Sequence, residues 1–172
     1  MKNLIIAVAI LLSSTISYNG ISQSLGSKLG HINSAELLSA MPEVKQADSD
    51  LQAYAQSLDN QYSNMVKEYQ TKAQEVQSQL EGMDELIRET KIRELAQTEE
   101  NINKFQVSAQ EKVAKKKEEL YGPILEKADQ AIKAVSESNG FTYIFDSSLG
   151  VLLFAGPDSQ DILPLVKTQL GI

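Results

Sequence analysis

The sequence predicts an α+β protein in which a small β body carries one long antiparallel helical hairpin. The stretch 44–138 contains one proline and two glycines, so little in it interrupts a helix. Apolar residues there recur every three or four positions, which is the spacing of a helix that buries a single narrow stripe. After residue 140, apolar and polar residues alternate, which is the period of a β-strand. These two periods predict a hairpin at 42–138 and a body built from 23–41 and 139–172.

The first 22 residues are predicted to be a cleavable signal peptide for export to the periplasm. Lys2 precedes an apolar run at 4–12, and small and polar residues follow it. Nine apolar residues are too few to span a bilayer. Gly20 and Ser22 provide the small side chains of a cleavage site after Ser22, and sites a few residues away fit as well. The sequence has no cysteine, so we expect neither a lipid anchor nor disulfide bonds in that oxidising compartment.

The body is expected to begin with a short strand at 28–33. A helical turn follows at 35–40, with Ser34 as its N-cap. Pro42 suits the first turn of the next helix, because its missing N–H would have no partner there in any case. Strand, short helix and long helix are therefore predicted to follow one another almost without linkers.

The outgoing helix of the hairpin is predicted from Pro42 to about Leu80, roughly 58 Å at 1.5 Å per residue. Its seam positions recur about every 3.55 residues, which favours a shallow left-handed supercoil with one partner helix. They are Val44, Ala47, Leu51, Tyr54, Leu58, Tyr62, Met65, Tyr69, Ala73, Val76, Leu80 and Met83. The return helix repeats the spacing more thinly, with polar residues at two seam positions: Ile92, Leu95, Thr98, Ile102, Phe105, Ala109, Val113, Lys116 and Leu120.

Two interruptions of the hairpin are expected. The tip is predicted at about 82–90, with Thr90 capping the return helix. Gly122 and Pro123 are expected to kink or break the return helix, because proline removes a backbone hydrogen bond and clashes with the preceding turn. A separate last helix is then predicted at 123–138.

The C-terminal part is predicted to contain a β-hairpin and a helix. Strands at 141–145 and 151–154 flank the turn 147–150. Asp158 or Ser159 is expected to cap the terminal helix. The apolar stripe of that helix is Ile162, Leu165, Val166 and Leu170.

So small a sheet cannot cover its own apolar faces and is marginal by itself. We therefore expect several copies of the chain to associate through the body, which would also close the strand edges. The candidate interface residues are Phe141, Ile144, Val151 and Leu153.

The composition argues against several classes of function. The chain carries 16 Lys and Arg against 23 Asp and Glu, a net charge of −7, which disfavours nucleic acid or anionic lipid as the main partner. It lacks Walker, Gly-x-Ser-x-Gly and two-histidine metal motifs. The single histidine, His31, has no neighbouring ligand type and is interpreted as a strand residue. We expect no enzyme activity, no cofactor, no metal site and no stable membrane insertion.

Two groups of side chains on the hairpin are candidate contacts. Tyr62, Met65 and Tyr69 are adaptable apolar residues that suit promiscuous contact with unfolded chains, although their seam positions favour simple packing between the helices. The run 115–117 is three lysines that could touch phosphate or lipopolysaccharide. Two glutamates follow it directly, so an ordinary solvated helix surface is the favoured interpretation.

Two segments resemble the Skp/OmpH family of periplasmic chaperones. They are INSAELLSAMPEV at 32–44 and GFTYIFDSSLGVLLFAGPDSQDILPLVKTQL at 140–170. The resemblance covers essentially the whole mature chain. It is most specific at the helix start 41–43 and in the order of strand, turn, strand and terminal helix after residue 140. It implies a homotrimer in which three chains form a small β-barrel body and helical tentacles enclose a cavity for unfolded outer-membrane proteins.

The resemblance further implies an ATP-independent holdase that prevents aggregation of its clients. The best-known members are strongly basic, whereas 44–138 holds 13 Lys and Arg against 18 Asp and Glu. Client capture is therefore expected to rest on apolar side chains and enclosure more than on charge. The alternative is a structural coiled-coil component or adaptor of a cell-envelope assembly, which would use the same fold with one fixed partner.

Overall fold

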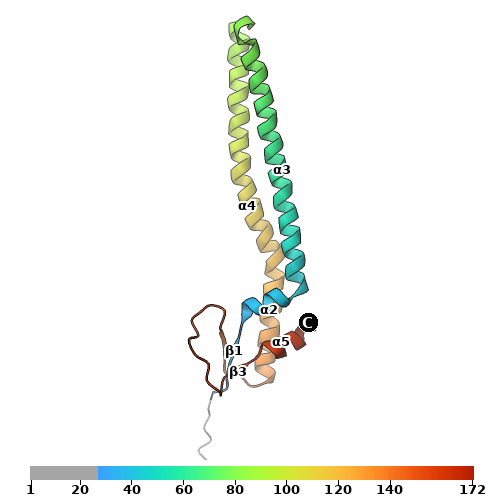
Figure 1. Ribbon diagram of the computed structural model, residues 1–172, viewed down its shortest axis with the longest axis vertical. Helices are drawn as coiled ribbons and strands as arrows, with labels where there is room; N and C mark the ends of the chain where they lie inside the picture. The colour runs from blue at the N-terminus through green and yellow to red at the C-terminus, as the bar shows by residue number, and fades with distance from the viewer. Residues whose placement is uncertain (1–26) are drawn as a thin grey trace, which may run out of the picture.

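The computed structural model describes residues 27–172 and shows a small body from which a long two-helix arm projects (Figure 1). The predicted signal peptide lies outside the described residues. The fold is α+β, with helices dominating and a short sheet in the body. The elements, in chain order, are β1 (Leu29–Ile32), α2 (Ser34–Ala40), α3 (Pro42–Gln79), the 3₁₀ turn η1 (Leu80–Gly82), α4 (Glu85–Ser138), β2 (Tyr143–Asp146), β3 (Gln160–Asp161) and α5 (Leu163–Leu170).

The sheet has the order β2-β1-β3, and β1 pairs in parallel with both neighbours. Parallel neighbours require a long crossover connection. Here α2, α3 and α4 form that connection, so the whole arm is an insertion between two paired strands. At the centre of the sheet, a Cβ on Gly30 would lie 2.8 Å from Ile144 Cδ1 and 3.0 Å from Phe141 Cε1. Only glycine lets the strands and these side chains approach so closely.

The predicted β-hairpin is wrong. Residues 151–154 form no strand, and β2 pairs with β1 instead. Two hydrogen bonds at the end of β2 direct the chain away from the sheet. Ser147 N donates to Ile32 O at 2.9 Å. Ser148 N donates to Asp146 Oδ1 at 2.9 Å. The edge of β2 that the hairpin would have used is therefore left open.

The body core packs α2, α5 and the last turns of α4 against one face of the sheet. Its largest fully buried side chains are Leu37, Met41, Ile162 and Val166. On α4, a stripe at helical spacing faces them, and its two alanines permit close approach: Ile124, Ala128, Ala131 and Val135. Most of the large buried side chains of the chain lie here, so the body is the firmest part of the molecule.

The arm consists of α3 and α4, which contact each other and lie side by side from body to tip (Figure 1). Every predicted seam position of the outgoing helix is buried or half-buried, which confirms the period read from the sequence. On α4 the prediction is wrong at Ile92, which is 54% exposed, whereas Leu95 and Ile102 face the seam as expected. Among arm residues 48–120, only Leu58 and Ile102 are buried, at 8% and 7% exposure, so the seam is thin.

The chain reverses at 80–84, at the start of the predicted tip. Asp84 caps α4 by accepting a hydrogen bond from Leu86 N at 3.0 Å. The predicted cap, Thr90, lies inside α4 and donates its hydroxyl to Leu86 O. Aspartate is the stronger cap, and its charge together with that of Glu85 is favourable at a helix N-terminus.

Helix α4 runs through Gly122 and Pro123 without interruption, so the predicted break and the separate last helix are wrong. A proline inside a helix costs about 3 kcal/mol. Burial of Ile124 and Ala128 directly after it offsets this cost.

Two other predicted caps are also wrong. Asn33, not Ser34, caps α2 through its bond from Glu36 N at 3.0 Å. At the terminal helix the N-cap residue is Ile162, not Asp158 or Ser159, and Asp161 Oδ1 accepts from Leu163 N at 2.9 Å.

Candidate functional site

An apolar groove opens along one side of the arm. It has a volume of about 490 Å³. Its floor is made by Leu58, Tyr62 and Val113 together with small residues that leave the space unfilled, and its rim is polar. The remaining lining residues are Ala55, Asp59, Gln106, Ala109, Gln110 and Ala114. We call this the arm groove.

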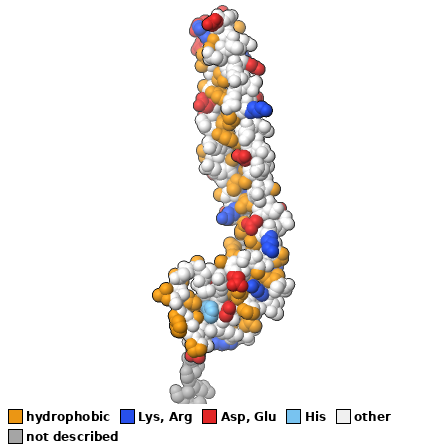
Figure 2. Space-filling model, in the orientation of Figure 1, with side chains coloured by type: hydrophobic (Ala, Val, Ile, Leu, Met, Phe, Trp, Pro, Cys, Tyr) orange, Lys and Arg blue, Asp and Glu red, His pale blue; other side chains and the backbone are white. Residues whose placement is uncertain are grey.

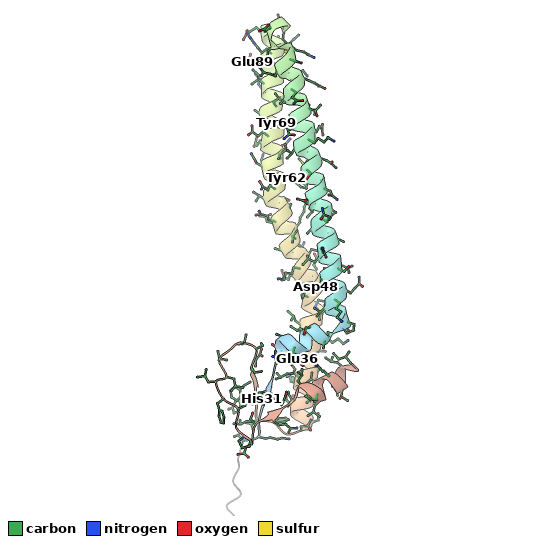
Figure 3. The ribbon with its side chains drawn as sticks, viewed as in Figure 1. His31, Glu36, Asp48, Tyr62, Tyr69 and Glu89 are labelled. Carbon is green, nitrogen blue, oxygen red and sulfur yellow. The ribbon has the colours of Figure 1, made fainter. Side chains whose placement is uncertain are left out.

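The structure separates the three predicted client-contact residues. Tyr62 lines the arm groove and is half-buried. Met65 and Tyr69 are also half-buried but do not line the groove. Tyr69 lies farther toward the tip than Tyr62 (Figure 3). Sequence analysis placed Ala109 in the seam but not in a contact site, and it did not name the groove residues Ala55 and Ala114. The available signal was Ala109, since a small residue at a seam position cannot fill the gap between two helices.

A second surface is an exposed apolar patch on the body. It covers the outer side of β2 and the loop that follows, where orange side chains gather beside the sheet (Figure 2). Its members are between 45% and 94% exposed: Tyr143, Phe145, Leu149, Val151, Leu153 and Phe154. The rings of Tyr143 and Phe145 lie 6.4 Å apart. Soluble proteins rarely leave so many adjacent large apolar side chains in water, so the patch indicates a contact surface. We call it the body patch.

The four predicted interface residues divide into two that are exposed and two that are partly buried. Val151 and Leu153 belong to the body patch and are 74% and 94% exposed. Phe141 and Ile144 are partly buried and pack against the core of their own chain. Ile144 lies on the core side of β2, whereas Val151 and Leu153 lie in the loop after β2, which forms no strand.

Asp146 fixes the direction in which the loop of the body patch leaves the sheet. Its carboxylate accepts from Ser34 Oγ at 2.5 Å, from Ser34 N at 3.3 Å and from Ser148 N at 2.9 Å. Burial raises the pKa of Asp146, but the hydrogen bonds from Ser34 and Ser148 outweigh it and hold the pKa at about 2. The ionised carboxylate also lies at the N-terminus of α2, where negative charge is favourable.

Comparison with known proteins identifies the family. A family model described as outer membrane protein (OmpH-like) matches residues 28–170. The chain belongs to this OmpH-like family. Its fold is similar to a crystal structure from Caulobacter crescentus CB15, described as OmpH-like and assigned as an outer membrane chaperone. The TM-score is 0.73 at 13% sequence identity, and the match covers 84% of this chain and 83% of that one. A search of curated protein sequences finds no significant match.

The OmpH-like match includes both the arm groove and the body patch. Some charges on the arm are paired within single helices. Lys72 lies 2.7 Å from Glu68, and Lys104 lies 2.7 Å from Glu100. In each pair the lysine hydrogen bond lowers the pKa of the glutamate. Such exposed pairs contribute little to stability.

The lysine run of the arm packs largely on aromatic rings. Lys116 Nζ is 6.0 Å from the centroid of the Tyr54 ring, and Lys117 Nζ is 5.9 Å from that of Tyr121. These are cation–π distances. They explain how a lysine is tolerated at a seam position, and they agree with the interpretation of the run as part of the helix surface.

His31 lies in β1, as expected, with Nδ1 3.0 Å from Ser159 Oγ. Between residues 27 and 172, no three His, Cys, Asp or Glu side chains gather closely enough to hold a metal ion. None of the helices in this part of the chain combines the length and apolarity needed to cross a bilayer.

Proposed function

We propose that this OmpH-like protein is an ATP-independent holdase chaperone of the periplasm. It holds unfolded outer-membrane proteins between the arms of three associated copies and prevents their aggregation. The observation that carries the proposal is the long projecting arm, whose apolar groove opens to solvent and whose length far exceeds the needs of the body. Family membership and the description of the Caulobacter structure support the same function.

The arm groove is the proposed contact for apolar client side chains, with Tyr62 as its main aromatic residue. One such groove gives weak binding, but several grooves facing a common cavity act together through effective concentration. The rim residues Asp59, Gln106 and Gln110 can exchange hydrogen bonds with an extended backbone. The groove lining contains no lysine or arginine, so we propose a grip that depends little on long-range charge.

The body patch is the proposed interface between three copies. With about 150–200 Å² per side chain, its exposed fractions leave on the order of 700 Å² of apolar surface in water. Each partner in a stable interface buries a similar area, about 800 Å². The open edge of β2 lies beside the patch and could pair with a strand of a neighbouring copy.

The test is suppression of aggregation. Purified protein, without ATP, should keep several unrelated urea-unfolded barrel proteins soluble on dilution, as followed by light scattering. Tyr62→Ser should weaken this effect. The control is Val107→Ser, which removes an exposed apolar side chain that lies on α4 outside the groove. Equal activity of the two variants would contradict the proposed grip.

The alternative function is a structural coiled-coil component or adaptor of a cell-envelope assembly. It predicts that unrelated barrel proteins aggregate equally with and without the protein, and that crosslinking in cells yields one fixed partner. That result would replace the holdase proposal.

A further inference from the structure

The single histidine of the chain lies on the outer face of the central strand of the sheet. His31 is half-buried, whereas Gly30 and Ile32 on either side of it are buried on the core side. Its register partners are Phe145 of β2 and Asp161 of β3, and paired residues of neighbouring strands point to the same face. Phe145 belongs to the body patch, and Figure 2 shows the pale blue histidine beside the orange side chains there.

A hydrogen bond ties His31 to the far end of the loop that carries most of the body patch. Its Nδ1 lies 3.0 Å from Ser159 Oγ. Ser159 N donates to Gly156 O at 3.0 Å and so closes the turn in which this loop ends. The imidazole therefore lies where the central strand, β2 and the loop meet. A second copy that covers the body patch also covers this ring.

The groups that face His31 provide no paired counter-charge. From β2, the aromatic rings of Tyr143 and Phe145 lie on the same face. From β3 comes the carboxylate of Asp161, which is exposed and accepts a hydrogen bond at the start of α5. The turn that ends the loop adds the exposed Asp158. The helices pack on the opposite face of the sheet. None of the ion pairs in the described part of the chain includes His31.

Burial of such a ring depends on its charge. Histidine is the side chain that ordinarily changes charge between pH 5 and 8. Burying a charged group without a partner is far more costly than burying a neutral one. The two exposed carboxylates are screened by water and salt, so their attraction for a charged ring is weak. Association that covers the ring therefore favours its neutral form, and by linkage it weakens as the ring takes up a proton.

We propose that His31 makes the association of copies through the body patch sensitive to mild acid. Copies stay together while the imidazole is neutral and separate as it becomes charged. This inference rests on the proposed interface at the body patch. Asp146 does not contribute in this pH range, because its pKa is about 2. Separation of the copies removes the cavity that their arm grooves share, so mild acid also weakens the hold on a client.

Nuclear magnetic resonance can follow the ring directly. The chain has one histidine, so tag-free protein with labelled histidine gives one imidazole signal. The parent protein is compared with a variant that carries Leu153→Ser and Phe154→Ser in the body patch. The signal of the parent should titrate at a pH lower by about one unit, which corresponds to association about tenfold weaker for the charged form. Equal midpoints, or a higher midpoint in the parent, would overturn the proposal.

Sedimentation velocity at about pH 7.5 and about pH 5.5 measures the consequence for association. The association of the parent should weaken at least tenfold at the lower pH. His31→Gln, which is uncharged at both, should associate equally at both. Ser159→Ala removes only the hydroxyl that bonds the ring and should keep the pH dependence of the parent, because charge is the cause. Circular dichroism establishes that each variant is folded.

The outcomes separate the pH sensitivity from the interface on which it rests. A parent protein that is a single chain at about pH 7.5 would refute the interface and the pH sensitivity together. An oligomer that is equally stable at both pH values would refute the pH sensitivity alone. Persistence of the pH dependence in His31→Gln, or its loss in Ser159→Ala, would show that the charge of this ring is not the cause.

Discussion

The body patch gives the sharpest test of the proposed association. Leu153 and Phe154 are 94% and 79% exposed in the single chain, so replacing both by serine removes almost no contact within that chain. If association buries them, each side chain contributes about 1.5–3 kcal/mol to the interface. The double variant should then lose about 3–6 kcal/mol per interface, which weakens association roughly 10²- to 10⁴-fold.

Sedimentation velocity over a range of concentrations measures this loss. The parent protein should keep the mass of an oligomer on dilution, whereas the double variant should dissociate to single chains with unchanged helix content. Val107→Ser is the control for exposure. Ile144→Ser is the control for the opposite face of β2, and it should lower the melting temperature because Ile144 packs on the core of its own chain. Identical dissociation of the parent and the double variant would refute the assignment of the interface to the body patch.

Three further predictions follow from the arm and from Asp146. The affinity for clients should change little between low salt and roughly 0.5 M salt, where charge effects are largely screened. A tenfold loss of affinity, about 1.4 kcal/mol, would instead indicate that the lysines at 115–117 bind the client. Among the helical segments, residues 76–95 should exchange their amide hydrogens fastest and residues 124–135 slowest, because the thin seam opens before the body core. The reverse order would contradict a projecting arm. Because the pKa of Asp146 is depressed from 3.8 to about 2, its contribution is complete above pH 4 and is lost as pH falls from about 4 to 2. After allowance for solvent screening it amounts to about 1–2 kcal/mol, and Asp146→Asn should lack this acid-dependent fall in chemical-denaturation curves.

The arm shows how far local pattern reaches. Helix spacing depends on residues three and four apart, so the seam from Val44 to Met83 could be predicted position by position. The end of the outgoing helix was also predicted within one residue. Caps were less predictable, because several polar residues compete at each helix start. Asp84 and not Thr90 caps α4, and Asn33 and not Ser34 caps α2.

Strand pairing was decided only by the tertiary structure. The alternation at 141–145 correctly predicts a strand, but adjacency in sequence suggested 151–154 as its partner. Its actual partner, β1, lies more than a hundred residues earlier. The sequence determined the arm, its seam and the apolar character of each segment, because these depend on near neighbours. Folding decided which apolar residues are covered, since a parallel pair brings distant strands together and leaves Leu153 and Phe154 in water while Phe141 and Ile144 pack inside.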